Sequence, residues 1–88
     1  MTEQITGVAI LDSNGRLWSL PEPCRHSHIY ALAAFMGTSA EPHHHGRDGF
    51  TTNLGRFVSR SEAYAIAEAA GQLKRRPSSP VLYSEDLW

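Results

Sequence analysis

Residues 49–73, GFTTNLGRFVSRSEAYAIAEAAGQL, decide the fold predicted for this chain. Their first part, residues 50–58, is typical of a β-hairpin whose turn lies at residues 53–55. The stretch therefore predicts two antiparallel strands, followed at once by a helix.

The predicted helix begins with a clear capping signal. Ser59 and Glu62 match the capping box, in which each side chain bonds a free backbone N–H group of the first turn. Small apolar residues then recur on one side of the helix, at Ala63, Ile66, Ala67 and Ala70. Gly71 is suited to end the helix. This stripe of small side chains allows a close approach to a sheet or to a partner helix.

The N-terminal half predicts a second unit of the same kind. Ile5–Leu11 is rich in β-branched residues and reads as a strand, and the turn signal at residues 12–15 leads into a return strand over residues 16–20. A helix is predicted over residues 25–36, ending at Gly37. Its apolar stripe consists of Ile29, Leu32, Ala33 and Met36.

The two halves echo each other in sequence. Residues 14–19 and residues 54–59 both contain Gly-Arg, two apolar residues and Ser, and both come before an alanine-containing helix that ends at glycine. Two ββα units packed together explain this echo, and chance similarity is the alternative. The predicted fold class is therefore α+β, with two β-hairpins and two helices packed on an antiparallel sheet.

The remaining segments are connections and a tail. Residues 38–48 form a polar stretch without periodicity that contains His43, His44 and His45, and we expect a flexible loop there. Residues 74–80 are expected to be a linker loop, and residues 81–83 a last short strand. The whole chain, residues 1–88, is expected to be one domain, because 88 residues with 41% hydrophobic content suffice for one small core.

Charge and cysteine content narrow the class of protein. A formal net charge of −1 excludes a polybasic nucleic-acid-binding protein and a charged DNA mimic, so no stable nucleic-acid binding is expected. Cys24 is the only cysteine, which excludes an internal disulfide and fits a reducing cytoplasm. The first residues lack a signal-peptide pattern, and no apolar stretch reaches the roughly 18 residues of a membrane span. We therefore expect a cytoplasmic protein without membrane contact.

The first group of residues that could carry chemistry is Cys24, Arg25, His26 and His28. These residues offer three zinc ligands, and the histidines of residues 43–45 could supply a fourth. However, the spacing matches no standard zinc module, and residues two apart on a helix do not share a face. Arg25 and His26 at a helix start favour an anion site over a metal, since free amides and the positive end of the helix dipole also lie there. An ordinary helix start with no ligand is the alternative.

The second group is Arg56, Arg60, Glu62, Tyr64 and Glu68. Arg60, Tyr64 and Glu68 are four residues apart and share one face of the helix, opposite the alanine stripe. Such a group could clamp a phosphate or a carboxylate through bidentate hydrogen bonds. A solvated helix face with ordinary ion pairs is the alternative.

The third group lies at the C-terminal end of the chain and comprises Gln72, Tyr83, Ser84, Glu85 and Asp86. We expect the acidic tail to fold back and to pair with Arg56 or Arg60. Two roles for this fold-back remain open. It could bind a ligand, or it could be architectural, with Leu87 and Trp88 packing against apolar surface while the acids orient the arginines.

The chain resembles a family of small phage and prophage proteins. The resemblance is carried by a set of residues spread over most of the chain outside the histidine loop: Gly49, Phe50, Thr51, Gly55, Arg56, Phe57, Val58, Arg60, Glu62, Ala63, Ile66, Ala67, Ala70, Gly71, Gln72 and the tail LYSEDLW of residues 82–88. Arg25 and His26 look like part of the same pattern, and Cys24 and the triple histidine do not. The resemblance implies a phage origin, a location in the host cytoplasm and a role in binding.

The leading hypothesis is a non-enzymatic phage-type protein, a counter-defence factor that sequesters a small anionic, nucleotide-like ligand. Its ligand-binding residues are expected to be Arg25, His26, Arg56, Arg60, Gln72, Ser84, Glu85 and Asp86. No catalytic residue, metal or cofactor is assigned. A small hydrolase is one alternative, with His26 or His28 as general base and an acidic tail residue orienting it.

The other alternative is a protein–protein inhibitor of a host factor, which would present Trp18, Tyr64 or Trp88 as exposed anchors. The same tryptophans and the alanine stripe of the second helix also lead us to expect a homodimer or a higher closed oligomer, because the core of so small a domain is thin. If the alanine stripe lies on the chain's own sheet instead, this basis for an oligomer disappears.

Overall fold

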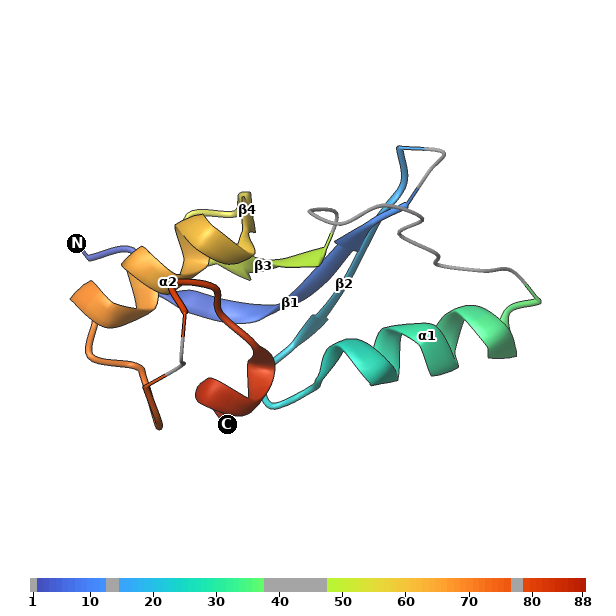
Figure 1. Ribbon diagram of the computed structural model, residues 1–88. Coiled ribbons are helices and arrows are strands. Elements are labelled where there is room, and N and C mark those ends of the chain that lie inside the picture. The colour runs from blue at the N-terminus through green and yellow to red at the C-terminus, as the bar shows by residue number, and fades with distance from the viewer. Residues whose placement is uncertain (1, 13–14, 38–47, 77–78) are drawn as a thin grey trace.

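Four strands form one antiparallel sheet, in the order β2-β1-β3-β4, in a computed structural model that describes residues 2–12, 15–37, 48–76 and 79–88 (Figure 1). The strands are β1 (Ile5–Leu11), β2 (Leu17–Pro21), β3 (Asp48–Thr52) and β4 (Phe57–Ser59). The helices are α1 (His26–Phe35) and α2 (Arg60–Ala69), and a short 3-10 turn, η1 (Ser84–Asp86), lies in the tail. The predicted α+β fold, with two hairpins and two helices on an antiparallel sheet, is confirmed.

Each hairpin contributes its first strand to the centre of the sheet and its second strand to an edge. Val8 of β1 lies opposite Leu20 of β2, and Phe50 of β3 lies opposite Val58 of β4. Val8 and Phe50 in turn lie opposite each other across the central β1–β3 pair. The two halves of the sheet are therefore built in the same way and meet at their first strands.

The helices of the two halves correspond to each other as the hairpins do. Both have ten residues, and their buried residues occupy the fourth and eighth positions, at Ile29 and Ala33 in α1 and at Ala63 and Ala67 in α2. Gly37 and Gly71 follow with φ angles of 75° and 70°, the left-handed conformation that ends a helix. The structure thus contains the two ββα units that the Gly-Arg echo predicts.

The start of α2 has the predicted capping box. The Ser59 hydroxyl accepts a hydrogen bond from the Glu62 backbone N–H at 3.2 Å, and the Glu62 carboxylate accepts one from the Ser59 N–H at 3.1 Å. Helix α1 starts differently, because Arg25 is its N-cap and no acidic residue lies in its first turn. The His28 ring nitrogen Nδ1 accepts from the Arg25 N–H at 2.9 Å. The two helix starts therefore differ in charge.

The core lies between the sheet and the two helices. It comprises Ile5, Val8, Ile10, Trp18, Ile29, Ala33, Phe50, Val58, Ala63, Ala67, Leu82 and Leu87. The stripe of small residues on α2 thus packs on the chain's own sheet. Trp18 is also buried, and its indole N–H donates to the buried Asp12 carboxylate at 2.9 Å. These features are satisfied within one chain and give no support to an oligomer.

The stripe predicted for α1 is only partly correct. Ile29 and Ala33 are buried, but Leu32 and Met36 are exposed. Helix α1 packs along one narrow side, mainly on β1 and β2, whereas α2 is held by the sheet and by the tail. None of the described helices is long and apolar enough to cross a membrane.

The tail folds back, although not as the predicted strand. Residues 81–83 are irregular, because the Leu82 N–H donates to the Arg60 carbonyl at the start of α2 instead of joining an edge of the sheet. Leu87 is buried, and the Trp88 indole donates to the Cys24 carbonyl at 2.8 Å. The architectural role expected for Leu87 and Trp88 is confirmed.

The acidic tail residues pair with other arginines than predicted. Glu85 lies 3.7 Å from Arg25, and Asp86 lies 2.8 Å from Arg75. The expectation that the tail acids pair with Arg56 or Arg60 is therefore wrong. Tail backbone reaches Arg60 instead, through the Leu82 carbonyl. The triple histidine of residues 43–45 lies outside the described residues, as does part of the predicted 74–80 linker.

The close packing around Gly49 generates a first prediction. A Cβ atom added to Gly49 would collide with the Val58 carbonyl oxygen and would lie 2.7 Å from the Phe57 ring. Gly49→Ala should therefore lower the free energy of unfolding by at least about 3 kcal/mol, as overpacking against backbone does. Urea denaturation measures the difference.

Gly55→Ala is the matched control, since nothing lies within 4 Å of its added Cβ and only the φ of 77° opposes it. It should cost about 1 kcal/mol. A Gly49→Ala protein as stable as Gly55→Ala would contradict the packing described here.

Candidate functional site

The first residues of the two helices meet at the start of β3. His26 opens α1, and its Nε2 lies 2.8 Å from the Gly49 carbonyl oxygen. Arg60 opens α2, and its guanidinium donates to the Asp48 carboxylate at 2.8 Å. Because Asp48 and Gly49 are neighbours in β3, both helix starts are anchored to one point of the central sheet.

His26 is held in a fixed ring orientation. Its ring stands edge-on to Phe50, with the centroids 5.1 Å apart and the planes at 85°. Because a carbonyl oxygen can only accept, Nε2 carries the hydrogen in the bond to Gly49. In the neutral ring, Nδ1 is then the acceptor, available to a donor from a ligand or a neighbour.

Burial lowers the pKa of His26 below its ordinary value of 6.5. The bond to Gly49 acts in the opposite direction, the Arg60 charge lowers the pKa further, and the charges of Asp48 and Glu85 raise it. Burial prevails because a half-buried imidazolium is poorly solvated. His26 is therefore neutral at pH 7.

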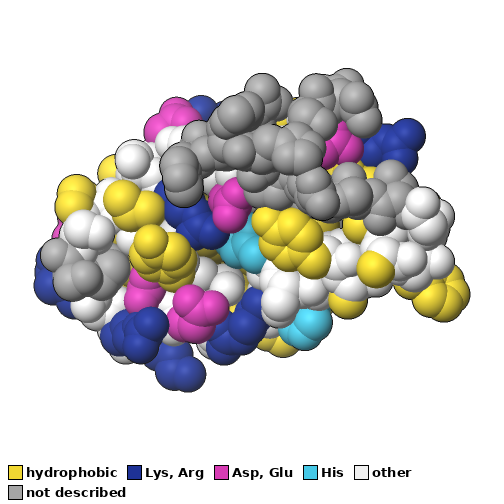
Figure 2. Space-filling view, turned by 45° about the vertical axis from the view of Figure 1, so that its right-hand side comes forward, with side chains coloured by type: hydrophobic (Ala, Val, Ile, Leu, Met, Phe, Trp, Pro, Cys, Tyr) yellow, Lys and Arg dark blue, Asp and Glu magenta, His cyan; other side chains and the backbone are white. Residues whose placement is uncertain are grey.

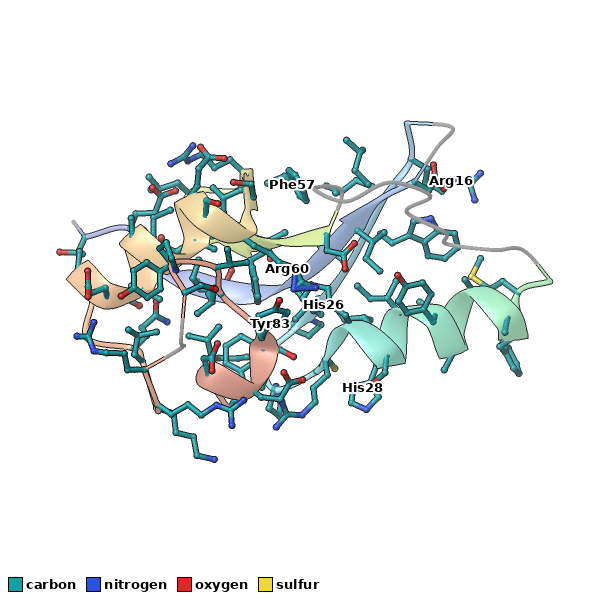
Figure 3. The ribbon with its side chains drawn as sticks, in the orientation of Figure 1. Arg16, His26, His28, Phe57, Arg60 and Tyr83 are labelled. Atoms are coloured by element: carbon teal, nitrogen blue, oxygen red, sulfur yellow. The ribbon has the colours of Figure 1, made fainter. Side chains whose placement is uncertain are left out.

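Arg60 joins the sheet to the tail. Besides the Asp48 pair, it donates to the Leu82 carbonyl at 3.5 Å, and its guanidinium lies 4.6 Å from the centroid of the Tyr83 ring. The Tyr83 side chain is 47% exposed, so a large part of the ring is open to solvent while the guanidinium covers another part. Figure 3 shows Arg60, His26 and Tyr83 side by side between the helices and the tail.

Arg25, at the cap of α1, contacts the tail from the other side. Its Nη2 donates to the backbone oxygen of Trp88, and its Nη1 lies 3.7 Å from the Glu85 carboxylate. Nη1 is buried, and no described residue gives it a hydrogen bond. A buried guanidinium N–H without a bond is costly, so this donor can gain from an added acceptor.

We name these six residues the helix-start cluster: Arg25, His26, Asp48, Arg60, Tyr83 and Glu85. The space-filling view shows a histidine at the surface, bordered by both basic and acidic side chains (Figure 2). Two positive helix ends, two guanidinium groups, one neutral imidazole and one exposed aromatic ring come together there. The two carboxylates balance the formal charge of the two guanidinium groups, so the remaining positive potential comes from the helix ends.

Five of the eight residues predicted for the site lie in or next to this cluster. Arg25, His26, Arg60 and Glu85 belong to it, and Ser84 is buried beside Glu85, to which its hydroxyl donates at 3.4 Å. Asp48 was in none of the predicted groups, and Tyr83 was in the third group but not among the expected ligand-binding residues. Asp48 was missed because it lies at the end of a polar stretch without periodicity, although its place just before the Gly49 strand was a usable signal.

The other predicted residues hold separate parts of the fold together. Arg56 binds the Glu3 carboxylate through two hydrogen bonds of 2.7 and 2.9 Å, and lies 4.0 Å from Glu62. Gln72 bonds both the N–H and the carbonyl of Ile5, at 2.8 and 2.9 Å. Asp86 accepts from the Arg75 side chain at 2.8 Å and from the Tyr83 N–H at 3.0 Å.

The second predicted group is divided between two places. Tyr64 donates to Glu68 at 3.1 Å, and Arg76 contacts both. These residues form the solvated helix face with ordinary ion pairs that was the alternative. Arg60, at the start of the same helix, is instead turned to the helix-start cluster.

The possible metal ligands near Cys24 have other partners. His26 bonds Gly49, the His28 Nδ1 bonds the Arg25 N–H, and Cys24 packs against the core. Within the described part of the chain, no three His, Cys, Asp or Glu side chains are placed to hold a metal ion.

Comparison with known proteins identifies a family for this chain. A family model described as "Phage T4 y16D protein" matches residues 4–88. No curated protein and no solved structure matches the chain. The family match covers both ββα units and the tail, and therefore every residue of the helix-start cluster.

The lowered pKa of His26 generates a prediction about acid stability. The unfolded chain binds a proton at this residue near pH 6.5, and the folded chain resists it, so the free energy of unfolding should fall as the pH drops below 6.5. Chemical denaturation at about pH 7.5 and about pH 5.5 measures this loss.

His26→Gln has no charge to gain, so it should lose less stability over the same interval. Equal acid sensitivity of the parent and His26→Gln would disprove the assignment.

The pair of Arg56 with Glu3 generates a second prediction. Its hydrogen bonds from Arg56, and next the bond from Thr52, lower the pKa of Glu3 from 4.5 to about 2. The stabilisation it gives is present above pH 4.5 and is lost as the pH falls toward 2. In an NMR titration the Glu3 carboxylate should titrate near pH 2, and in Arg56→Gln its midpoint should rise toward 4.5. If the titration midpoint of Glu3 is the same in Arg56→Gln as in the parent protein, the Arg56–Glu3 pair is ruled out.

Proposed function

The chain belongs to the phage T4 y16D protein family, and we propose that it is a small phage binding protein whose helix-start cluster takes an anionic, nucleotide-like ligand. It acts without catalysis, as a counter-defence factor that sequesters this ligand in the host cell. The observation that carries the proposal is the meeting of the two helix starts beside the exposed ring of Tyr83.

The start of α1 supplies the anion-binding end. Its first turn has no acidic residue, and Arg25 carries a buried N–H group that no described residue bonds. Backbone N–H groups and the helix dipole favour negative charge at such a helix start. The present neighbour, Glu85, is exposed and 3.7 Å away, a weak ion pair that a phosphate can displace at low cost.

The tail supplies an aromatic surface on which a nucleobase of the ligand can stack. Tyr83 presents an exposed ring beside the Arg60 guanidinium, and aromatic rings stack nucleobases irrespective of sequence. The neutral Nδ1 of His26 is a hydrogen-bond acceptor close by, suited to an N–H group of a base. Together these groups match a ligand that has both a phosphate and an aromatic ring.

The contacts favour binding over hydrolysis. His26 already donates to a backbone carbonyl, and the Nδ1 of His28 already accepts from Arg25. Asp86, one of the expected orienting acids, is bonded to Arg75. A general base needs a free nitrogen and an acid that orients it. His26 keeps Nδ1 as an acceptor, but in the described part of the chain its Nε2 is bonded to a carbonyl and not to an orienting carboxylate.

The aromatic anchors expected for a protein–protein inhibitor are occupied within the chain. Trp18 is buried, Trp88 donates to the Cys24 carbonyl, and Tyr64 donates to Glu68. A hot-spot residue must be able to enter a partner's pocket. These three side chains therefore favour the ligand-binding proposal.

Calorimetry against a panel of nucleotides and cyclic oligonucleotides tests the proposal. We expect one ligand class to bind, and Arg60→Gln and Tyr83→Leu each to weaken it about tenfold to hundredfold, the value of one charged hydrogen bond or one stacked base. Arg56→Gln is the matched control, because Arg56 is an arginine bound to Glu3 outside the cluster, and it should bind as the parent does.

Circular dichroism shows whether each variant is folded. A folded parent protein that binds no member of the panel would refute the proposal. So would a ligand whose affinity falls in Arg56→Gln and not in Arg60→Gln.

A further inference from the structure

Helix α1 has apolar side chains on its outer side as well as on its inner side, and the described chain covers only the inner side. Residues 26–37, HSHIYALAAFMG, contain no Asp, Glu, Lys or Arg. Only Ile29 and Ala33 are buried, on the side that faces the sheet. A helix that is hydrophobic all round is normally buried all round.

The uncovered side of α1 carries a second apolar stripe. Ala31 and Phe35 are four residues apart and face away from the buried pair, and Leu32 and Met36 are exposed at the border of the buried side. Phe35 is 89% exposed and Met36 is 59% exposed. A phenylalanine buries about 150–250 Å² when it is covered, so exposure of this ring alone is a large cost.

From this face we propose that two copies of the chain pair through the outer sides of their α1 helices, with Phe35 at the centre of the contact. In a twofold dimer each surface meets its own copy, so any charge on it would meet a like charge. The outer face of α1 carries no formal charge, which is the condition for such self-pairing. Ala31, one helical turn before Phe35, is small, so that the two helices can approach to about 8–10 Å.

The rest of the chain offers poorer occupants for this face. Residues 38–47, TSAEPHHHGR, follow α1 directly and are predominantly polar in sequence. The tail is already held at the cap of α1 by Trp88 and at α2 by Leu82. A charged partner would gain no ion pair on this surface. A second copy brings an equally apolar, equally uncharged helix.

The pairing is independent of the proposed ligand site. The cluster lies at the N-terminal end of α1, around His26, and the apolar stripe runs toward its C-terminal end, at Phe35. Figure 1 shows this end of α1 projecting away from α2 and from the tail. A dimer can therefore form whether or not a ligand binds.

Sedimentation velocity over about 1–100 μM, the range in which weak interfaces assemble, tests the pairing. We expect the parent protein to approach twice the 9.7 kDa chain mass as its concentration rises. Phe35→Glu should stay at the mass of one chain throughout, because two buried carboxylates would face each other. Since Phe35 is 89% exposed, this variant should keep the parent's circular dichroism spectrum.

Leu54→Glu is the matched control, because Leu54 is a 60% exposed hydrophobic residue in the β3–β4 turn, away from α1. It should dimerise as the parent does. A parent protein of single-chain mass at every concentration would overturn the proposal, and so would a dimer that Phe35→Glu leaves intact.

Discussion

The antiparallel pairing of β1 with β3 is the constraint on which the rest of the structure depends. Each ββα unit by itself is a two-stranded hairpin with one helix in about 40 residues, a length that is usually too short to be stable alone. Joined at their first strands, the two units place Val8 against Phe50 at the centre of a four-stranded sheet. The same pairing brings both helices over one core.

This pairing also creates the helix-start cluster. Since the two units meet at β1 and β3, the helix that follows each hairpin begins near the middle of the sheet, and His26 and Arg60 reach neighbouring residues of β3. Repeated structure alone would make the two starts alike. They differ because α2 is capped by Ser59 and Glu62 while α1 is capped by Arg25, so negative charge is favoured more strongly at α1.

The tail completes both the core and the cluster. Leu82 and Leu87 fill apolar space, while the alternate residues Tyr83 and Glu85 remain exposed at the cluster. The buried Asp86 carboxylate holds this arrangement in place, because it accepts hydrogen bonds from the Tyr83 N–H and from the Arg75 side chain. One short segment is thus architectural through its buried residues and available to a ligand through its exposed ones, which joins the two roles that the sequence left open.

The sequence by itself determined the elements whose signals are local. The strand at Ile5–Leu11, the capping box at Ser59 and the glycine ends of both helices depend on neighbours within a few residues, and the structure has each of them. Only the tertiary structure decided the long-range partners. Gln72 bonds Ile5, which is 67 residues away along the chain. Glu85 pairs with Arg25 and not with Arg56 or Arg60. Charged and polar side chains have several partners of equal chemistry along a chain, so packing of the apolar core selects among them.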